Sequence, residues 1–165
     1  MIPIDAITFR PFLPEDDDFN YKVYASTRAE EMKLVDWSPG QQEDFLRMQF
    51  QAQWKHYNAY YPQAEYLVIQ RGETPVGRLF VERSANSILI MDIALLPEYR
   101  NAGIGTAILK DLMKEAGLAG LPLVLRVEFF NPVISLYTRL GFVKTREINT
   151  VYQEMVWTQE KRPEG

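Results

Sequence analysis

Alternation between apolar and polar residues predicts the elements of the first third of the chain. Residues 7–12, ITFRPF, alternate and predict a short edge strand. Pro14 and the acidic residues after it indicate the first turn of a helix, where the helix dipole favours negative charge, and we expect that helix to reach about Leu34 in one or two pieces. Ser38–Pro39 predicts the start of a long helix over residues 39–60. One stripe of this helix is expected to hold Phe45, Met48, Gln49, Ala52 and His56.

The remainder of the chain alternates between strand patterns and helix patterns. Residues 65–70, 75–83 and 87–96 are strand candidates separated by turns, so they predict an antiparallel meander. The elements expected after the meander are a helix over 104–117, a mostly apolar strand over 121–130, a short helix capped by Asn131–Pro132 and ending near Leu140, and a closing hairpin formed by KTREI (144–148) and TVYQEMVW (150–157). We therefore expect one mixed α/β domain over residues 1–165.

Composition narrows the class of protein. The chain has 165 residues, of which 47% are apolar, and a net charge of -4, so we expect a packed domain that binds no nucleic acid. It has no cysteine and one histidine, which excludes disulfides, thiolate metal sites and a cysteine acyl-enzyme, and we expect no metal. The sequence shows neither a signal peptide nor an apolar run of membrane-spanning length, so a soluble, cytoplasmic protein without membrane contact is expected.

The segment YRNAGIG, residues 99–105, joins the last strand of the meander to a helix. A glycine-rich loop before a helix is suited to phosphate, because the first N–H groups of the helix are unpaired and glycine removes the Cβ that would block a close approach. The loop matches neither G-x-G-x-x-G nor a P-loop. On its own, the pattern fits a phosphate site and an ordinary helix-starting loop equally well.

A second motif favours the phosphate site over the ordinary loop. The loop, with the preceding IALLPEYR, is followed after about 25 residues by NPVISLYTRLGF, residues 131–142. Together they resemble the acyl-CoA loop (R/Q-x-x-G-x-G/A) and the N-x-x-x-x-x-Y-x-x-x-G-F segment of the GNAT family, the GCN5-related N-acetyltransferases. The resemblance covers roughly residues 75–145, whereas residues 10–60 match in layout more than in letters. It implies a single domain with a mixed, mostly antiparallel central sheet, flanked by helices and splayed between the fourth and fifth strands.

The resemblance also implies a binding mode for acetyl-CoA as the acyl donor. Backbone N–H groups of residues 101–106 would cradle the pyrophosphate, and the main chain of residues 93–95 would hold the pantetheine arm. Asn131 would contact the cofactor where strands 87–96 and 121–130 separate. The implied cofactor-binding residues are Ile93, Ala94, Leu95, Arg100, Asn101, Ala102, Gly103, Ile104, Gly105, Thr106, Asn131 and Tyr137.

Tyr137 is the residue that the resemblance places at the thioester sulfur. A tyrosine hydroxyl, with a reference pKa of about 10, can protonate the departing thiolate. A backbone N–H near residues 93–95 would stabilise the developing oxyanion. Because the chain has no cysteine, direct attack by the amine is simpler than a covalent intermediate. The alternative is that Tyr137 is only a core aromatic.

The general base is harder to assign from the sequence. Some family members carry a glutamate on the strand that here reads LVLRVEFF, and this chain has Arg126 at that place and Glu128 two residues later, on the same strand face. Glu128 is thus either a relocated base or the partner of Arg126. Asp92 on the neighbouring strand is the other catalytic candidate, and it could pair with Arg126 instead.

These features predict an acetyl-CoA-dependent N-acetyltransferase. One rival is a CoA-binding sensor or partner-binding module of the same fold without catalysis, and another is an enzyme of this fold that transfers a longer acyl group. The acceptor is expected to be a small-molecule amine or a peptide amine, and the sequence does not identify it. Many members of the family dimerise, and nothing in the sequence decides the oligomeric state.

Overall fold

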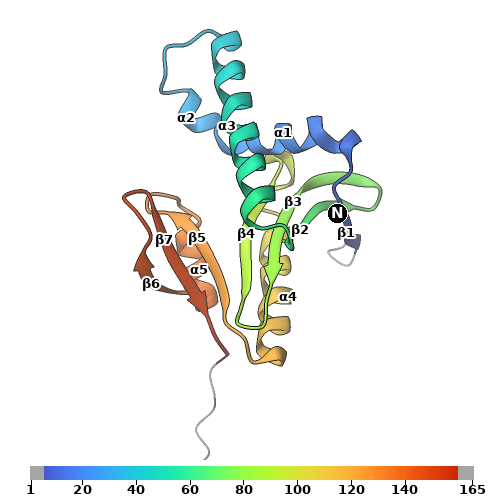
Figure 1. Cartoon of the computed structure of the whole chain (residues 1–165), viewed down its shortest axis with the longest axis vertical. Coiled ribbons are helices and arrows are strands. Elements are labelled where there is room, and N and C mark those ends of the chain that lie inside the picture. The colour runs from blue at the N-terminus through green and yellow to red at the C-terminus, as the bar shows by residue number, and fades with distance from the viewer. Residues whose placement is uncertain (1–5, 160–165) are drawn as a thin grey trace, which may run out of the picture. The chain divides into compact units, whose positions relative to one another are not determined.

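The computed structural model describes residues 6–159 (Figure 1). Its elements in chain order are β1 (Ile7–Pro11), η2 (Pro14–Asp16), α1 (Asp17–Thr27), α2 (Ala29–Met32), α3 (Pro39–Tyr60), β2 (Glu65–Arg71), β3 (Thr74–Arg83), β4 (Ile88–Leu95), η3 (Pro97–Tyr99), α4 (Ile104–Ala119), β5 (Leu123–Glu128), α5 (Ile134–Leu140), β6 (Val143–Glu147) and β7 (Tyr152–Trp157). No helix in the described part of the chain combines the length and the apolar character needed to cross a membrane.

A seven-stranded sheet has the order β1-β2-β3-β4-β5-β7-β6. β1 pairs antiparallel with β2, and β7 pairs antiparallel with both β5 and β6. The exception is β4, which pairs in parallel with β5 through Ile88–Ile90 and Leu123–Leu125. The predicted α/β class, the mixed and mostly antiparallel sheet, and the edge position of the first strand are therefore confirmed.

The chain divides into two compact units, which are described separately. The first comprises the residues up to Phe80 together with Asp92–Gly105, and the second comprises Val81–Met91 together with the residues from Thr106 onwards. The expectation of a single domain over 1–165 stays a prediction.

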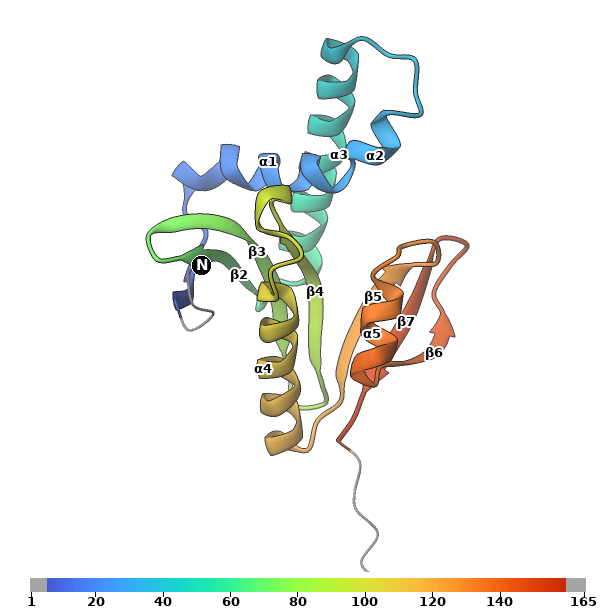
Figure 2. The same cartoon turned by 180° about the vertical axis from the view of Figure 1, so that it is seen from behind.

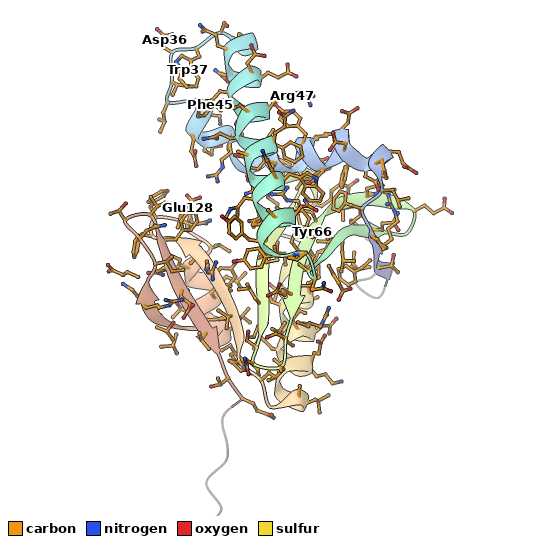
Figure 3. All side chains as sticks on the ribbon, in the orientation of Figure 1. Asp36, Trp37, Phe45, Arg47, Tyr66 and Glu128 are labelled. Atoms are coloured by element: carbon orange, nitrogen blue, oxygen red, sulfur yellow. The ribbon has the colours of Figure 1, made fainter. Side chains whose placement is uncertain are left out.

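An aromatic cluster forms part of the core of the first unit. The ring of Phe80, on β3, lies 5.6 Å from that of Trp54 and 5.8 Å from that of Tyr57, both on α3. Tyr66, on β2, lies 5.0 Å from Phe80, and its hydroxyl donates to the carbonyls of Tyr57 and Tyr61 at 2.9 and 3.0 Å (Figure 3). The same two carbonyls also accept the backbone N–H groups of Tyr61 and Ala64, at 2.8 and 3.2 Å, so the hydroxyl adds a second donor to each at the end of α3. The cluster therefore fixes the C-terminal end of α3 to the sheet.

Helix α3 begins where the sequence predicts. The Ser38 hydroxyl accepts from the N–H of Gln41 at 3.2 Å, the Gln41 side chain accepts from the N–H of Ser38 at 2.9 Å, and Pro39 occupies the first helical position. The predicted stripe does not face the core, because Met48, Gln49, Ala52 and His56 are exposed and Phe45 is only partly buried. The side chains that face the core lie one position later and are Leu46, Phe50, Gln53, Trp54 and Tyr57.

The predicted N-terminal helix is formed in two α-helical pieces after a short 3-10 turn. Asp16, in this turn, is buried, and its carboxylate accepts from Arg10 at 2.7 and 2.9 Å and from the N–H of Leu13 at 2.9 Å. The Arg10 hydrogen bonds hold the pKa of Asp16 below its ordinary value. Asp16 therefore fixes the connection between β1 and α1.

The second unit contains α5 packed along β5 and β7, as both views show (Figure 1, Figure 2). Helix α5 ends at Gly141, which has a φ of 104°, and the N–H groups of Gly141 and Phe142 bond to the carbonyls of Thr138 and Tyr137. This is a Schellman motif, in which glycine avoids the strain of the left-handed conformation. The predicted helix stop at Gly141, the buried Phe142 and the closing hairpin β6–β7 are confirmed.

Candidate active site

The glycine loop between η3 and α4 has two residues in left-handed conformations. Asn101 has a φ of 60° and Gly103 a φ of 85°, with Ala102 between them. Residues 101–103 are exposed, and α4 begins at Ile104. Left-handed residues in a turn can point successive N–H groups towards one place, and such a turn binds anions. The unpaired N–H groups at the start of a helix add further donors beside it. The two left-handed residues and the exposed start of α4 are features that suit an anion.

Arg100 fixes the base of this loop. Its Nε donates to the carbonyl of Leu95, at the end of β4, at 2.9 Å. One terminal nitrogen donates to the Ser26 hydroxyl at 3.2 Å, near the end of α1. The guanidinium therefore ties the loop to elements of its own unit, and it is the backbone of the loop that is available to a ligand.

Gly105, in the first turn of α4, has open space around its Cα. A Cβ built there would meet no atom within 4 Å, and the residue does not have a positive φ. Neither packing nor backbone conformation requires glycine, although glycine inside a helix costs about 1 kcal/mol relative to alanine. The space beside Gly105 is therefore open to a group that approaches the backbone.

The end of β4 lies unusually close to β3. A Cβ added to Gly77 would stand 2.2 Å from the carbonyl oxygen of Ala94 and 3.1 Å from the Cα of Leu95. The N–H of Leu96 donates to the carbonyl of Val76 at 2.8 Å, so the pairing continues past the end of the strand. Gly77 therefore sets the position of the backbone at residues 93–95, where the resemblance implies pantetheine binding.

Asp92 has a partner other than the Arg126 considered from the sequence. Its Oδ2 accepts a hydrogen bond from a terminal nitrogen of Arg78, on β3, and the two form an ion pair. The side chain of Arg78 is 1% exposed and that of Asp92 is 22% exposed. This ion pair gives Asp92 a role other than that of the base considered from the sequence.

Tyr137 and Asn131 lie in the second unit. Tyr137 is buried on α5, with its ring 5.7 Å from that of Phe142. The side chain of Asn131 accepts from the N–H of Val133 at 3.0 Å and its carbonyl accepts from the N–H of Ile134 at 3.1 Å. Asn131 thus caps the turn before α5, and the helix itself starts later than the sequence predicts.

Glu128 and Arg126 share one face of β5, as the strand alternation predicts. Leu123, Leu125 and Val127 are buried on the other face. Across the ladder, Glu128 stands opposite Tyr152, whose hydroxyl donates to it at 3.4 Å, and Arg126 stands opposite Glu154 (Figure 3 shows Glu128 at the end of β5). This face of β5 and β7 therefore places Arg126 beside Glu154 and Glu128 beside Tyr152.

Glu154 is the most strongly held acid of this face. It accepts from Arg146 at 3.1 Å and from the Thr145 hydroxyl at 2.8 Å, and the Arg146 hydrogen bond lowers its pKa. Glu128 accepts a longer hydrogen bond, from the Tyr152 hydroxyl at 3.4 Å.

The comparisons with known proteins agree with this architecture. A family model described as an acetyltransferase (GNAT) domain matches residues 62–144, about half of the 165-residue chain. The chain belongs to the GNAT family of acetyltransferases. The region matched contains β4, the glycine loop, Tyr137 and Gly141. No curated protein matches the chain.

Solved structures of GNAT proteins show the same fold. The PaiA N-acetyltransferase of Thermoplasma acidophilum, solved in complex with coenzyme A, is 20% identical, covers 93% of this chain and 99% of its own, and has a TM-score of 0.68. An acetyltransferase of Thermus thermophilus is 19% identical, with coverages of 93% and 97% and a TM-score of 0.65. The ribosomal-protein-S18-alanine N-acetyltransferase of Escherichia coli is 19% identical, with coverages of 96% and 97% and a TM-score of 0.62.

The GNAT motifs in the sequence do not reveal two residues that contact the candidate catalytic carboxylates. Arg78 holds Asp92, and Tyr152 contacts Glu128. The first carried a signal, since a single arginine lies in the apolar run VGRLFV at 76–81, where a surface charge is not expected. The second carried none, because the pairing of β5 with β7 depends on the order of strands in the sheet.

Proposed function

We propose that this GNAT protein transfers an acetyl group from acetyl-CoA to a primary amine by direct attack. The observation that carries the proposal is the glycine loop. Its left-handed residues, Asn101 and Gly103, and the open position at Gly105 form a cradle that the protein itself does not fill. The anionic pyrophosphate of the cofactor is the group that such a cradle favours.

The cofactor would be bound largely by main chain. Backbone N–H groups from Asn101 to Thr106 hold the pyrophosphate, and the backbone of Ile93–Leu95 pairs with the pantetheine arm. A backbone N–H near Leu95 then stabilises the oxyanion that forms when the amine attacks the thioester. Asn131 is a further proposed contact of the cofactor. Acetyl-CoA supplies the activated acyl group, and no metal takes part in this scheme.

Proton transfer is assigned to two side chains of the second unit. Tyr137 donates its hydroxyl proton to the departing thiolate. Glu128 is the proposed base that receives the proton of the amine, because it lies on β5 two residues from the place where some members of the family carry a glutamate. Together the two transfers leave a neutral amide and a free thiol, after which the Tyr137 phenolate regains a proton and Glu128 releases one.

A CoA-binding protein without catalysis is the second candidate. The observation that favours it is Arg126, exposed and opposite Glu154, at the place where some members of the family carry a glutamate. This candidate predicts binding of acetyl-CoA without transfer to any amine.

The experiment that tests the proposal measures binding and turnover on the same preparation. Calorimetric titration with acetyl-CoA establishes the affinity, and release of free thiol is then followed against a panel of small amines, amino acids and peptides with free N-termini. The proposal expects saturable binding and amine-dependent release. Binding without release favours the second candidate, and the absence of binding contradicts both.

A further inference from the structure

Arg78 is a charged residue in the interior of the first unit. It lies in the middle of β3, its side chain is 1% exposed, and it is one of the largest fully buried side chains among the described residues. A buried charge is costly and is kept only where paired groups compensate it, and an apolar residue of similar size is often as stable or more so. Stability alone therefore does not account for an arginine at this position.

The contacts of Arg78 come from three neighbouring elements of its unit. One terminal nitrogen donates to the side-chain oxygen of Asn20, on α1, at 2.9 Å. The other donates to Gln53, on α3, at 3.0 Å and to Oδ2 of Asp92, on β4. The guanidinium carbon also lies 4.7 Å from the centre of the Phe80 ring. The guanidinium is thus fixed from several sides, and it in turn fixes the carboxylate of Asp92.

Asp92 is the only charged group among these partners, and it is partly exposed to solvent. Its side chain is 22% exposed, whereas Asn20 is 1% exposed. Within residues 6–159, Oδ1 of Asp92 has no hydrogen-bond partner. The carboxylate therefore has one oxygen held by Arg78 and one oxygen open to a donor.

Asp92 also precedes the backbone that we propose for the acyl arm. It is followed directly by Ile93–Leu95 on β4, and adjacent Cα atoms are about 3.8 Å apart. A donor bound at Oδ1 of Asp92 would therefore stand within a few ångströms of that backbone. An amine acceptor, in its ammonium form before attack, is the donor that a carboxylate binds best.

We infer that Arg78 is a positioning residue, which orients Asp92 so that its free oxygen binds the ammonium group of the acceptor. The inference rests on the proposed function and adds an acceptor contact to it. Because the orientation of Asp92 is set before the acceptor arrives, no side-chain order has to be acquired on binding. Asp92 acts here as an anchor for the amine and not as the base.

The test compares Arg78→Met, Asp92→Asn and the double variant in the thiol-release assay, with the amine from the panel that the wild-type protein uses best. Each single change is expected to raise KM for the amine roughly 10- to 100-fold, the effect of losing one charged hydrogen bond. The kcat is expected to stay within about threefold, because the reacting groups remain in place. The double variant is expected to match Asp92→Asn, since the two residues act as a unit.

Two controls separate positioning from a loss of structure. Arg83→Met removes an arginine from the end of the same strand, where it pairs with Glu115 at 2.6 Å on the surface, and it is expected to leave both constants unchanged. The affinity for acetyl-CoA, measured by calorimetry, is expected to be the same in every variant. Should Arg78→Met fail to fold, Asp92→Asn, which is nearly isosteric and partly exposed, tests the same anchor.

The outcomes are distinct. A wild-type protein that turns over an amine, with an unchanged KM in Arg78→Met or Asp92→Asn, overturns the inference and leaves the proposed function intact. A fall in kcat or in acetyl-CoA affinity at constant amine KM shows a structural role and also overturns it. A wild-type protein that uses no amine contradicts the proposed function and this inference with it.

Discussion

At the scale of the residue, the same side chain type takes different roles according to its partners. Asp16 and Asp92 are both aspartates bound to an arginine. Asp16 is almost enclosed by Arg10 and the N–H of Leu13 and connects two elements. Asp92 keeps one oxygen open and is therefore the one with binding capacity.

The role of Tyr137 is tested by Tyr137→Phe. If the hydroxyl is the proton donor to the thiolate, kcat falls by about 10²- to 10⁴-fold, the usual effect of losing a positioned acid. Affinity for acetyl-CoA stays the same, because the ring remains against Phe142. Steady-state kinetics with an active amine and calorimetry measure the two quantities. A kcat within about twofold of the wild-type value, with chemistry rate-limiting, contradicts the assignment.

The pH dependence of stability tests the role of Asp16. Its pKa is lowered in the folded state, so its contribution is present above the pKa of the unfolded chain, about 3.9, and is lost as the pH falls through the lower folded value. The free energies of unfolding of wild type and Asp16→Asn, measured in urea, are expected to differ most near pH 7. The difference is expected to shrink as the pH falls below about 4.

A matched exposed acid provides the comparison for Asp16. Asp17→Asn, one residue later, is expected to change the free energy of unfolding less than Asp16→Asn at pH 7. A constant difference between wild type and Asp16→Asn from pH 7 down to about 3 contradicts the proposed ion-pair contribution.

At the scale of the element, starts and stops are encoded by local chemistry. The capping box at Ser38, the two-piece N-terminal helix and the glycine stop at Gly141 were all predictable, because each depends on a few consecutive residues. The buried face of α3 was not, because Phe45, Leu46 and other apolar residues lie at several phases of the helix. Packing against the Phe80 cluster selects Leu46 and Phe50, and that partner is far away in sequence.

The candidate site also has parts that the sequence predicts and parts that it does not. The glycine loop was found from the sequence because it is one continuous segment before a helix. The network of Arg78 was not, since its partners Asn20 and Gln53 lie 58 and 25 residues away along the chain. The apolar run around Arg78 signals its burial, but no local pattern identifies the partners that it meets.

The first turn of α4 gives a prediction that separates ligand binding from folding. Gly105→Ala is expected to stabilise the fold by up to about 1 kcal/mol, because alanine is the better helix former and the space is open. The same methyl group occupies the space proposed for the pyrophosphate, so affinity for acetyl-CoA falls. Thermal unfolding and calorimetry measure the two effects.

Gly40→Ala is the matched control for Gly105→Ala. Gly40 also lies in the first turn of a helix, α3, and a Cβ there also meets nothing within 4 Å. It is expected to raise stability to a similar extent and to leave cofactor affinity unchanged. Unchanged affinity in Gly105→Ala removes the assignment of this loop to the pyrophosphate.

The close approach of β3 and β4 makes Gly77 sensitive to any side chain. In Gly77→Ala the methyl group would stand 2.2 Å from the backbone oxygen of Ala94, so the strands have to move apart. We expect destabilisation of about 3 kcal/mol, as for overpacked cores, and weaker binding of acetyl-CoA because the backbone of Ile93–Leu95 shifts. Urea unfolding that gives no loss of stability would show that β4 accommodates the change.

At the scale of the whole molecule, family and chemistry rest on different observations. The family follows from the match over residues 62–144, and the likeness to solved GNAT structures concerns the fold. The same fold serves catalytic and non-catalytic proteins, so the activity has to be argued from the site. The proposed activity rests on the glycine loop at the start of α4 and on Tyr137 in the family motif.

Amine-dependent release of thiol from acetyl-CoA by the wild-type protein is the measurement that tests the central claim most directly. The account predicts that at least one primary amine in the panel accelerates release well above the rate without amine, and that mass spectrometry finds one acetyl group on that amine per thiol released. Saturable binding of acetyl-CoA with no acceleration by any amine, and no acetylated product, would contradict it.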